Sequence, residues 1–284
     1  MAKVNLTRRQ FLRGVAAVPL FGVSAVSAYA SLLEPRSYVV RETDIFVREL
    51  PEAFEGFRIA QITDVHHSRI VTIGEVRRVV ELAMGAKPDL IALTGDYTTS
   101  YRRYIEPCAE ALGGLSAPEG VWAVLGNHDH YTDPLLTVRA LKRHRISVLE
   151  NRNTVIERGS DTLQLAGVGD WTWNRADWAR SLYGIDKRRP TVMLSHQPVV
   201  IDLPEIAGIS LILSGHTHGG QVSLPLVGAP LRFGRDFKYV RGLYEKNGTQ
   251  LYVSPGTGVI GLPLRFGVRP EISILKLRKA GDGG

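Results

Sequence analysis

The chain has 284 residues, 44% of them hydrophobic and 22% charged, as in an ordinary globular protein with room for one large domain or two small ones. Its single cysteine, Cys108, excludes an intrachain disulfide and a cysteine-rich zinc site. The net charge of +7 includes Lys3, Arg8, Arg9 and Arg13, which leaves only +3 for the rest, so no nucleic-acid partner is expected and a nuclease is a disfavoured alternative.

The first thirty residues have the pattern of a targeting signal. Arg8 and Arg9 precede Phe11 and Leu12, and an uncharged run over 14–30 ends in an A-x-A cleavage pattern. This order is typical of a twin-arginine export signal, so we expect residues 1–30 to be a twin-arginine signal peptide or anchor. The export machinery is then a partner, and the protein reaches the periplasm or the outer face of the cytoplasmic membrane. Cleavage stays open because the run could remain as an anchor; a basic arm before a short helix is the alternative.

Residues 31–43 are interpreted as a linker, and a single domain is expected over 44–284. Its first half alternates strands with helices, as α/β proteins do. The expected helix at 74–84 carries apolar residues at helical spacing and is followed by Pro88. Strands are expected at 44–50, 57–63, 89–94 and 121–125, and helices at 74–84, 104–112 and 134–143.

Beyond about residue 150 the pattern changes to short apolar and β-branched runs. No linker separates the two halves. The predicted fold class is therefore α/β, with two packed mixed β-sheets flanked by helices in one domain. Strands of the second half are expected at 154–157, 163–168, 191–194, 209–213, 220–224, 250–253 and 271–277.

Five of the expected strands end in residues that can bind a metal ion. Ligands of open α/β sheets bind beyond the carboxyl ends of the strands, so the five groups should meet at one rim. In extended chain, residues i and i+2 point the same way, which would let both members of each D-x-H or H-x-H pair face one centre. The neighbouring glycines allow sharp turns and close approach. The residues are, in chain order, Asp64, His66, Asp96, Asn127, His128, Asp129, His196, His216 and His218.

Each of these groups also has a weaker, structural interpretation. A single histidine at a strand end is usually hydrogen-bonded within the protein, and Gly-Asp is a common turn pair. Asn127 or Asp129 would also suit the N-cap of the following helix. Five of the eight histidines, however, follow expected strands, and chance convergence explains this poorly.

The polar groups are five short motifs in a fixed order: D-V-H at 64–66, G-D at 95–96, G-N-H-D at 126–129, His196, and G-H-T-H at 215–218. This set resembles that of the calcineurin-like metallophosphoesterases, and the match covers about residues 57–220. The continuation G-G-Q and the twin-arginine start are more narrowly similar to the exported YaeI/YkuE-type phosphodiesterases. The resemblance implies a four-layer α-β-β-α sandwich and a metal-dependent phosphoric ester hydrolase, most narrowly a phosphodiesterase.

The same resemblance implies a pair of divalent or transition metal ions, for which these ligands suit Mn, Zn or Fe without choosing among them. The ions would lower the pKa of a shared water, whose hydroxide would attack phosphorus in line. His128 would stabilise developing charge or protonate the leaving oxygen, and Asp129 would orient its ring. The ligands would form two groups that share Asp96: a first of Asp64, His66, Asp96 and His218, and a second of Asp96, Asn127, His196 and His216.

The substrate is harder to infer than the reaction. The string G-D-Y-T-T-S-Y at 95–101 lacks the G-D-x-x-D-R-G signature of protein phosphatases. Three tryptophans lie in 170–178, and P-L-R-F-G occurs at 230–234 and 263–267. Such basic and aromatic loops either grip a lipid-linked or nucleotide phosphate, or rest on a membrane surface, or pack into the core.

The leading function is an exported phosphodiesterase that acts on a phosphodiester or on a lipid or nucleotide phosphoester of the cell envelope. One alternative is a UDP-diacylglucosamine-type pyrophosphatase or another lipid-linked phosphoester hydrolase, because some members of the similar subgroup cleave UDP-diacylglucosamine. Another is a non-enzymatic metal-binding envelope protein on the same fold. It is disfavoured because every ligand position of the motif set is filled.

Overall fold

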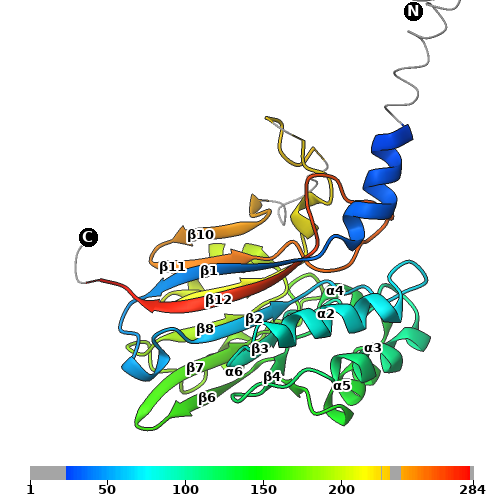
Figure 1. Ribbon diagram of the computed structural model, residues 1–284. Coiled ribbons are helices and arrows are strands. Elements are labelled where there is room, and N and C mark those ends of the chain that lie inside the picture. Colours follow the sequence, from blue (N-terminus) through cyan, green and yellow to red (C-terminus); the bar gives the residue numbers. More distant parts are fainter. Residues whose placement is uncertain (1–23, 225, 231–237, 282–284) are drawn as a thin grey trace, which may run out of the picture.

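The computed structural model describes residues 24–224, 226–230 and 238–281, which form two six-stranded β-sheets packed against each other (Figure 1). The first sheet contains, in spatial order, β1 (Val39–Val47), β12 (Glu271–Lys279), β2 (Arg58–Ile62), β3 (Leu90–Leu93), β4 (Val121–Ala123) and β5 (Ser147–Val148). The second contains β10 (Gly242–Lys246), β11 (Thr249–Val253), β9 (Leu211–Ser214), β8 (Thr191–Leu194), β7 (Asp161–Gly167) and β6 (Arg152–Arg158).

Both sheets are mixed, which confirms the predicted fold class. In the first sheet β2, β3, β4 and β5 run parallel, while β12 is antiparallel to β2. In the second sheet β7, β8, β9 and β11 run parallel, and the edge strands β6 and β10 are antiparallel to their neighbours. The parallel strands of each sheet therefore end at a common rim.

The core between the sheets comes from alternate residues of the facing strands, because successive side chains of a strand point to opposite faces. Ile59 and Leu275 of the first sheet and Leu165 and Leu213 of the second are buried in this layer. The layer fixes the two sheets against each other, and with them the loops at the strand ends.

Three helices cover the outer face of the first sheet: α2 (Ile73–Gly85), α3 (Ile105–Leu112) and α5 (Pro134–Arg143) (Figure 1). The apolar stripe predicted for α2 is buried in this layer. Thr72 and Glu75 form a capping box at the start of α2, which satisfies backbone N–H groups that the helix itself leaves without partners. The cap also fixes where the loop after β2 ends.

Shorter elements cover the outer face of the second sheet. They are two 3-10 turns, η5 (Pro198–Asp202) and η6 (Pro204–Ile206), and the single turn α6 (Trp178–Ser181). Ile201 and Ile206 are buried against this face. The fourth layer of the expected sandwich is thus present but thin within the described part of the chain.

Two of the predicted segments have a different structure. Residues 39–43, assigned to a linker, form the first half of β1, which pairs in parallel with β12 along its whole length. The polar sequence R-E-T-D lacks the apolar pattern of a buried strand, because an edge strand exposes such side chains to water. Residues 220–224 are not a strand; they follow the 3-10 turn η7 (His218–Gly220) as a loop.

Strand β10 is absent from the predicted elements. It forms a hairpin with β11, in which Lys246 faces Thr249 across the two-residue turn Asn247-Gly248. Asn247 and Gly248 have φ values of 51° and 78°, as a type I′ turn requires. The Asn-Gly pair was therefore the available signal for this hairpin.

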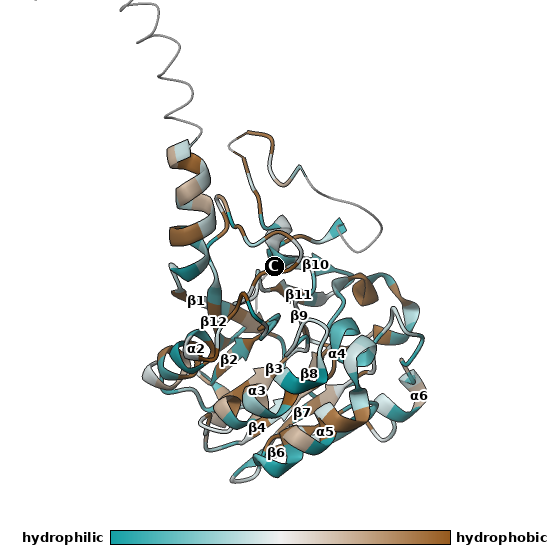
Figure 2. Ribbon diagram, turned by 90° about the vertical axis from the view of Figure 1, so that its right-hand side faces the viewer, coloured by the Kyte–Doolittle hydropathy of each residue, from teal (hydrophilic) through white to brown (hydrophobic). Residues whose placement is uncertain are grey.

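The described N-terminal segment is helical. Residues 24–28 are α-helical and continue into η1 (Tyr29–Leu33) and η2 (Glu34–Arg36). Figure 2 shows this segment rising beyond the sheets, with hydrophobic residues along it. Among the described residues, none of the helices has the length and apolarity needed to cross a membrane.

Two buried contacts attach this segment to the body. The carbonyl of Ala30 accepts a hydrogen bond of 2.9 Å from the N–H of Arg265. The Oε1 atom of Glu34 accepts one of 2.8 Å from the N–H of Val268. Both Ala30 and Glu34 are buried, so the helical segment is packed against the loop before β12.

Candidate metal centre

All seven predicted metal ligands lie in loops at the ends of strands, and they meet at one rim. A continuous series of contacts shorter than 4 Å connects them. The convergence expected from the strand order is therefore present. Their positions are Asp64 and His66 after β2, Asp96 after β3, Asn127 at the start of α4 (Asn127–Thr132) after β4, His196 after β8, and His216 and His218 after β9.

One group of ligands consists of Asp64, His66 and His218. The Nε2 atoms of the two imidazoles are 3.1 Å apart. The Oδ1 atom of Asp64 lies 3.2 Å from Nε2 of His218 and 3.9 Å from Nε2 of His66. All three side chains are buried. Two nitrogens and a carboxylate oxygen this close together can hold a single metal ion.

The other group is centred on His196. Its Nε2 atom lies 3.1 Å from Oδ1 of Asn127 and 3.3 Å from Nδ1 of His216. The Oδ2 atom of Asp96 lies 3.3 Å from Nε2 of His196 and 3.5 Å from Nε2 of His66. One oxygen of Asp96 therefore stands between the two groups, where a ligand shared by two ions would lie.

The backbone at the ligands is unusual. Asp64, His66, Asp96, His216 and His218 have φ values between 51° and 71°, a left-handed conformation that residues other than glycine seldom adopt. The paired ligands converge as predicted, but the predicted cause, an extended chain, is wrong. The pairs converge on a chain that turns sharply at each ligand. Non-glycine residues in this conformation cluster at functional sites.

The glycines next to the ligands make room for them, as predicted. A Cβ atom at Gly215 would lie 2.2 Å from Oδ2 of Asp64 and 2.2 Å from Oγ1 of Thr63. A Cβ atom at Gly126 would lie 2.2 Å from Oδ1 of Asp96. Both distances are far below van der Waals contact, so the two carboxylates occupy space that only glycine leaves free.

Replacement of Gly215 by alanine should therefore push Asp64 away from its position. Since a misplacement of about 1 Å in an active site costs roughly a hundredfold in rate, we expect turnover to fall by about that factor. Metal content per chain, measured by mass spectrometry, should fall with it. Gly85→Ala, where no atom lies within 4 Å of the new Cβ, is the matched control; equal activity of the two variants would contradict the prediction.

The hydrogen bonds of His196 suit a metal ligand. The carbonyl of Thr94 lies 2.8 Å from Nδ1 of His196. A carbonyl can only accept, so Nδ1 carries a proton and Nε2 is the atom available to a metal. Metal-bound histidines commonly donate their other N–H to a backbone carbonyl in this way.

The charges of the site also fit a cation. Asp64 and Asp96 are both buried, and within the described ranges neither has a lysine or arginine as an ion-pair partner. Burying a carboxylate without a counter-charge is costly. Together with three neighbouring imidazoles, these carboxylates form a donor set that suits divalent transition metals.

The pKa values follow from burial and from these carboxylates. Burial lowers the pKa of His66 to about 3 and holds the pKa of His218 well below its usual value. Both rings are therefore neutral, the form that binds metal. Burial also raises the pKa of Asp64.

His196 and Asp96 behave differently, because they are in contact with each other. Burial alone would lower the pKa of His196, but the adjacent Asp96 carboxylate outweighs it and raises this pKa to about 10. Burial alone would raise the pKa of Asp96, but His196 outweighs it and lowers this pKa. In the metal-free protein a proton on His196 thus balances a carboxylate, and a metal at Nε2 would displace it.

The contacts of Asp129 correct its predicted role. Its carboxylate accepts hydrogen bonds from the N–H groups of Asp96 at 2.8 Å, Gly126 at 2.9 Å and Tyr97 at 3.0 Å. As the third residue of α4 it turns back toward the start of its own helix, so it holds the backbone of two motifs and does not orient the ring of His128. Burial, and then Asp96, raise the pKa of Asp129 to about 7 in spite of these bonds.

The ring of His128 is oriented by a backbone carbonyl instead. Its Nδ1 atom lies 2.6 Å from the carbonyl of Thr99, to which it donates, so Nε2 is left free. The ring centroid lies 4.9 Å from that of His66, nearly perpendicular to it. The backbone N–H of His128 donates to Oδ1 of Asp96 at 2.8 Å. His128 therefore lies beside both groups of ligands and is not itself required as a metal ligand.

The tryptophan-rich segment lies beside the centre. The indole N–H of Trp173 donates to the carbonyl of Asn127 at 3.1 Å, and Trp173 is 46% exposed. Trp171 is 40% exposed, whereas Trp178 is packed against the core. Of the three interpretations given from the sequence, core packing therefore suits Trp178, whereas Trp171 and Trp173 are exposed.

Arg265, in the second P-L-R-F-G string, has a structural role that sequence reasoning missed. It is fully buried and donates to the carbonyls of Pro255 and Gly258. The N–H of Gly258 in turn donates to the carbonyl of Asp64 at 2.7 Å. Burial lowers the pKa of Arg265 to about 10, although Asp64 opposes this. Arg265 thus supports the loop beneath Asp64 and does not reach the surface. All but Pro230 of the first copy lies outside the described residues.

The centre has the features of a hydrolase that uses two metal ions, and comparison with known proteins agrees. A family model described as calcineurin-like phosphoesterase matches residues 57–220, more than half of the chain. Similar proteins include an uncharacterized metallophosphoesterase, YkuE, of Bacillus subtilis, with 32% identity over 96% of this chain and 98% of that one. Another is the phosphodiesterase YaeI of Escherichia coli, with 31% identity over 96% of this chain and 99% of that one.

A zebrafish transmembrane protein with a metallophosphoesterase domain is 32% identical over 95% of this chain, which spans 64% of that protein. The chain belongs to the calcineurin-like phosphoesterase family. It is accordingly a metal-dependent phosphoester hydrolase with a dinuclear centre, for which its two ligand clusters provide the side chains.

Proposed function

We propose that this hydrolase is a phosphodiesterase, and that each ligand serves the ion assigned to it from sequence. The observation that carries the proposal is the position of Asp96 Oδ2, within 3.5 Å of both His66 and His196. The Escherichia coli relative, a phosphodiesterase, supports diesters as the substrate class. When bound, two such ions would lower the pKa of a water molecule and neutralise charge on the phosphoryl group.

His128 is the residue we propose to move a proton. Its Nδ1–H is held by the carbonyl of Thr99, so a proton on Nε2 can be given to the departing oxygen. Asp129 acts through the backbone: its three N–H bonds hold the turns that carry Asp96 and Asn127. It is therefore a positioning residue.

The function is tested with the full-length chain in a mild non-ionic detergent. The protein is stripped of metal, then given Mn, Zn or Fe, and assayed on bis-p-nitrophenyl phosphate and p-nitrophenyl phosphate. We expect metal-restored cleavage with the diester preferred. A preferred monoester would overturn the diester assignment. Two bound ions per chain with no cleavage of either substrate would favour the metal-binding protein instead.

We further propose that Arg8 and Arg9 direct export by the twin-arginine route, so that the enzyme works in the periplasm or at the outer face of the cytoplasmic membrane. The support is the sequence pattern, since residues 1–23 lie outside the described residues. Protease added to spheroplasts should degrade the wild-type chain, and the double variant Arg8→Lys/Arg9→Lys should be protected. Protection of both chains would contradict export.

The docking of the N-terminal segment favours an anchor that is retained. The carbonyl of Ala30 is bonded to Arg265, and the ring of Tyr29 lies edge-on to that of Phe266 with centroids 6.4 Å apart. Cleavage after Ala30 would remove both contacts. Mass spectrometry of the chain isolated from membranes should therefore find residues before Ser31; a mature N-terminus at Ser31 would contradict retention.

For the substrate we propose a lipid-linked or nucleotide phosphoester of the cell envelope, with an apolar or aromatic group next to the phosphorus. Trp173 supports this, because its exposed ring is bonded to the backbone of the ligand Asn127. Such a ring can stack on a base or pack against a hydrocarbon chain. A UDP-diacylglucosamine-type pyrophosphate would offer both groups.

Replacement of Trp173 by alanine should raise KM for bis-p-nitrophenyl phosphate by about threefold to tenfold, with kcat nearly unchanged, because an aromatic contact of this kind contributes about 0.5–1.5 kcal/mol. Trp171→Ala, a change in the same segment, is the variant for comparison. Trp173→Phe, which keeps an aromatic ring, should have a KM close to that of wild type. A fall in kcat at constant KM would show that Trp173 holds Asn127 in place and does not contact substrate.

A further inference from the structure

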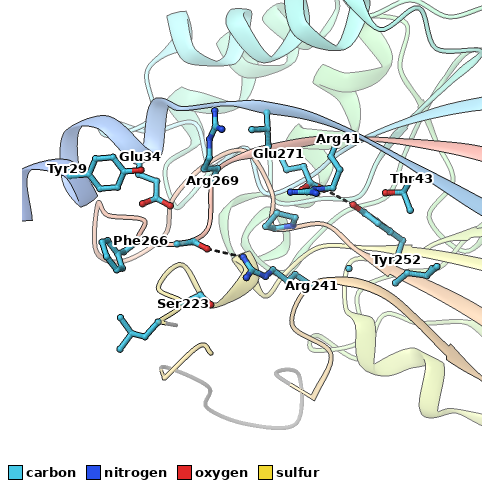
Figure 3. A pocket seen from close by; sticks show the side chains of 16 residues that line it. Tyr29, Glu34, Arg41, Thr43, Ser223, Arg241, Tyr252, Phe266, Arg269 and Glu271 are labelled. Atoms are coloured by element: carbon cyan, nitrogen blue, oxygen red, sulfur yellow. Dashed lines mark hydrogen bonds and ion pairs between the residues drawn. The ribbon is translucent and has the colours of Figure 1, made fainter. Parts of the chain in front are cut away.

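A cavity of about 1020 Å³ opens beside the N-terminal segment, against strands β1, β10, β11 and β12 (Figure 3). None of the nine residues assigned to the metal centre lines it. Its wall combines three arginines with aromatic and aliphatic side chains. The cavity is therefore a second, separate place where a ligand could be held.

The arginines of this cavity differ in their partners. Arg41 is paired with Glu271, at 2.7 Å between Nε and Oε2. Arg241 donates through Nη1 to the carbonyl of Gly267 at 3.1 Å. Arg269 donates through Nε to the carbonyl of Ser37 at 2.8 Å. Carbonyls position a guanidinium group without neutralising it.

Arg241 and Arg269 thus keep their charge. Both are exposed, and within the residues that the structure describes neither has a carboxylate within 4 Å. Glu34, the other acid of the wall, is buried and accepts from the N–H of Val268. Both arginines line the cavity, and in Figure 3 their guanidinium groups point in different directions. The cavity therefore presents two positive charges that no carboxylate of the described residues balances.

The remaining wall is apolar and open. Tyr29 and Phe266 form an edge-to-face pair, and Leu224 and Leu243 are 39% and 46% exposed. The turn after Leu224 exposes Leu226 completely. Apolar surface left in water beside two free charges fits a ligand that has both an anionic and a hydrocarbon part.

We propose that this cavity binds one anionic phospholipid, with its phosphate on Arg241, in a wall to which Arg269 adds a second positive charge, and with its acyl chain along Tyr29, Phe266 and Leu224. The planar fork of a guanidinium group matches two oxygens of a phosphate. Tyr29 belongs to the end of the uncharged run over 14–30, so the cavity would lie close to any membrane that holds this run. The site does not depend on which ester the metal centre hydrolyses.

The test measures binding by calorimetry to the metal-free full-length chain in non-ionic detergent, so that the metal centre contributes no phosphate binding. The probe is dihexanoyl phosphatidic acid. We expect Arg241→Gln/Arg269→Gln to weaken binding at least tenfold, and Arg241→Lys/Arg269→Lys to weaken it less. The charge-matched control Arg77→Gln/Arg152→Gln, at two exposed positions far from this wall in sequence, should bind like wild type.

Two further probes separate the parts of the ligand. Glycerol 3-phosphate has the anion without the chain, and dihexanoyl phosphatidylcholine has a phosphate balanced by its own cation; both should bind at least tenfold more weakly. Equal binding of glycerol 3-phosphate would contradict the proposal that the ligand is a lipid. Equal binding of phosphatidylcholine would contradict the recognition of net negative charge. Unchanged binding in Arg241→Gln/Arg269→Gln, with an unchanged melting temperature, would overturn the site. Once metal is restored, turnover of bis-p-nitrophenyl phosphate by this variant should equal that of wild type.

Discussion

Replacement of Asp96 by asparagine should reduce turnover of bis-p-nitrophenyl phosphate by at least about a thousandfold, and bound metal from two ions per chain to one or none. One oxygen of Asp96 lies within 3.5 Å of both His66 and His196, and an amide there is neutral and offers a single oxygen. No other described carboxylate contacts both of these histidines. The loss of one residue should therefore affect both ions.

The measurement combines metal analysis by mass spectrometry with steady-state kinetics. Asp44→Asn is the control, because Asp44 is an exposed partner of Arg278 far from the centre. Melting temperatures of both metal-free variants show whether they fold. A variant Asp96→Asn that keeps two ions per chain would contradict the shared position of this residue.

Replacement of His128 by alanine should leave both ions bound and lower kcat by about a hundredfold to ten-thousandfold, the usual contribution of a general acid. Metal is retained because the contact of residue 128 with Asp96 is made by the backbone N–H, which alanine keeps. Alanine also suits the helix that begins at Asn127.

If His128 is the general acid, a second expectation follows. A leaving group that departs readily as an anion needs little protonation, so the loss in His128→Ala should be larger for a phenyl ester than for a p-nitrophenyl ester. Equal losses for the two esters would point to stabilisation of charge on the phosphoryl group. Loss of metal in this variant would make His128 a ligand and contradict the assignment.

The chemistry of the site was predictable because its residues lie in short, contiguous motifs of the sequence. Each ligand motif follows an apolar run, and strand ends of an α/β sheet share a rim. The same local reading gave most strands and the three long helices. It failed for the first half of β1, an edge strand whose polar residues Arg41, Glu42 and Asp44 are exposed, and for β10, whose turn signal is Asn247-Gly248.

What the sequence could not reveal depends on tertiary contacts. The three N–H groups that bind Asp129 come from two different loops, so its partner is fixed only once β3 and β4 are side by side. Arg265 shares the string P-L-R-F-G with residues 230–234, yet it is buried under Asp64. Aspartate and histidine adopt a left-handed backbone more often than most residues but far less often than glycine, so they signal it only weakly.

The left-handed backbone at five of the predicted ligands links the stability of the folded protein to bound metal. Each such residue costs on the order of 1 kcal/mol or more, and glycine cannot relieve the cost because the side chain is the ligand. Only the folded chain presents these ligands together, so bound metal shifts the equilibrium toward folding, by about 4 kcal/mol for each independent site at a free concentration a thousand times its Kd. Removal of the metal should therefore lower the free energy of unfolding as well as turnover.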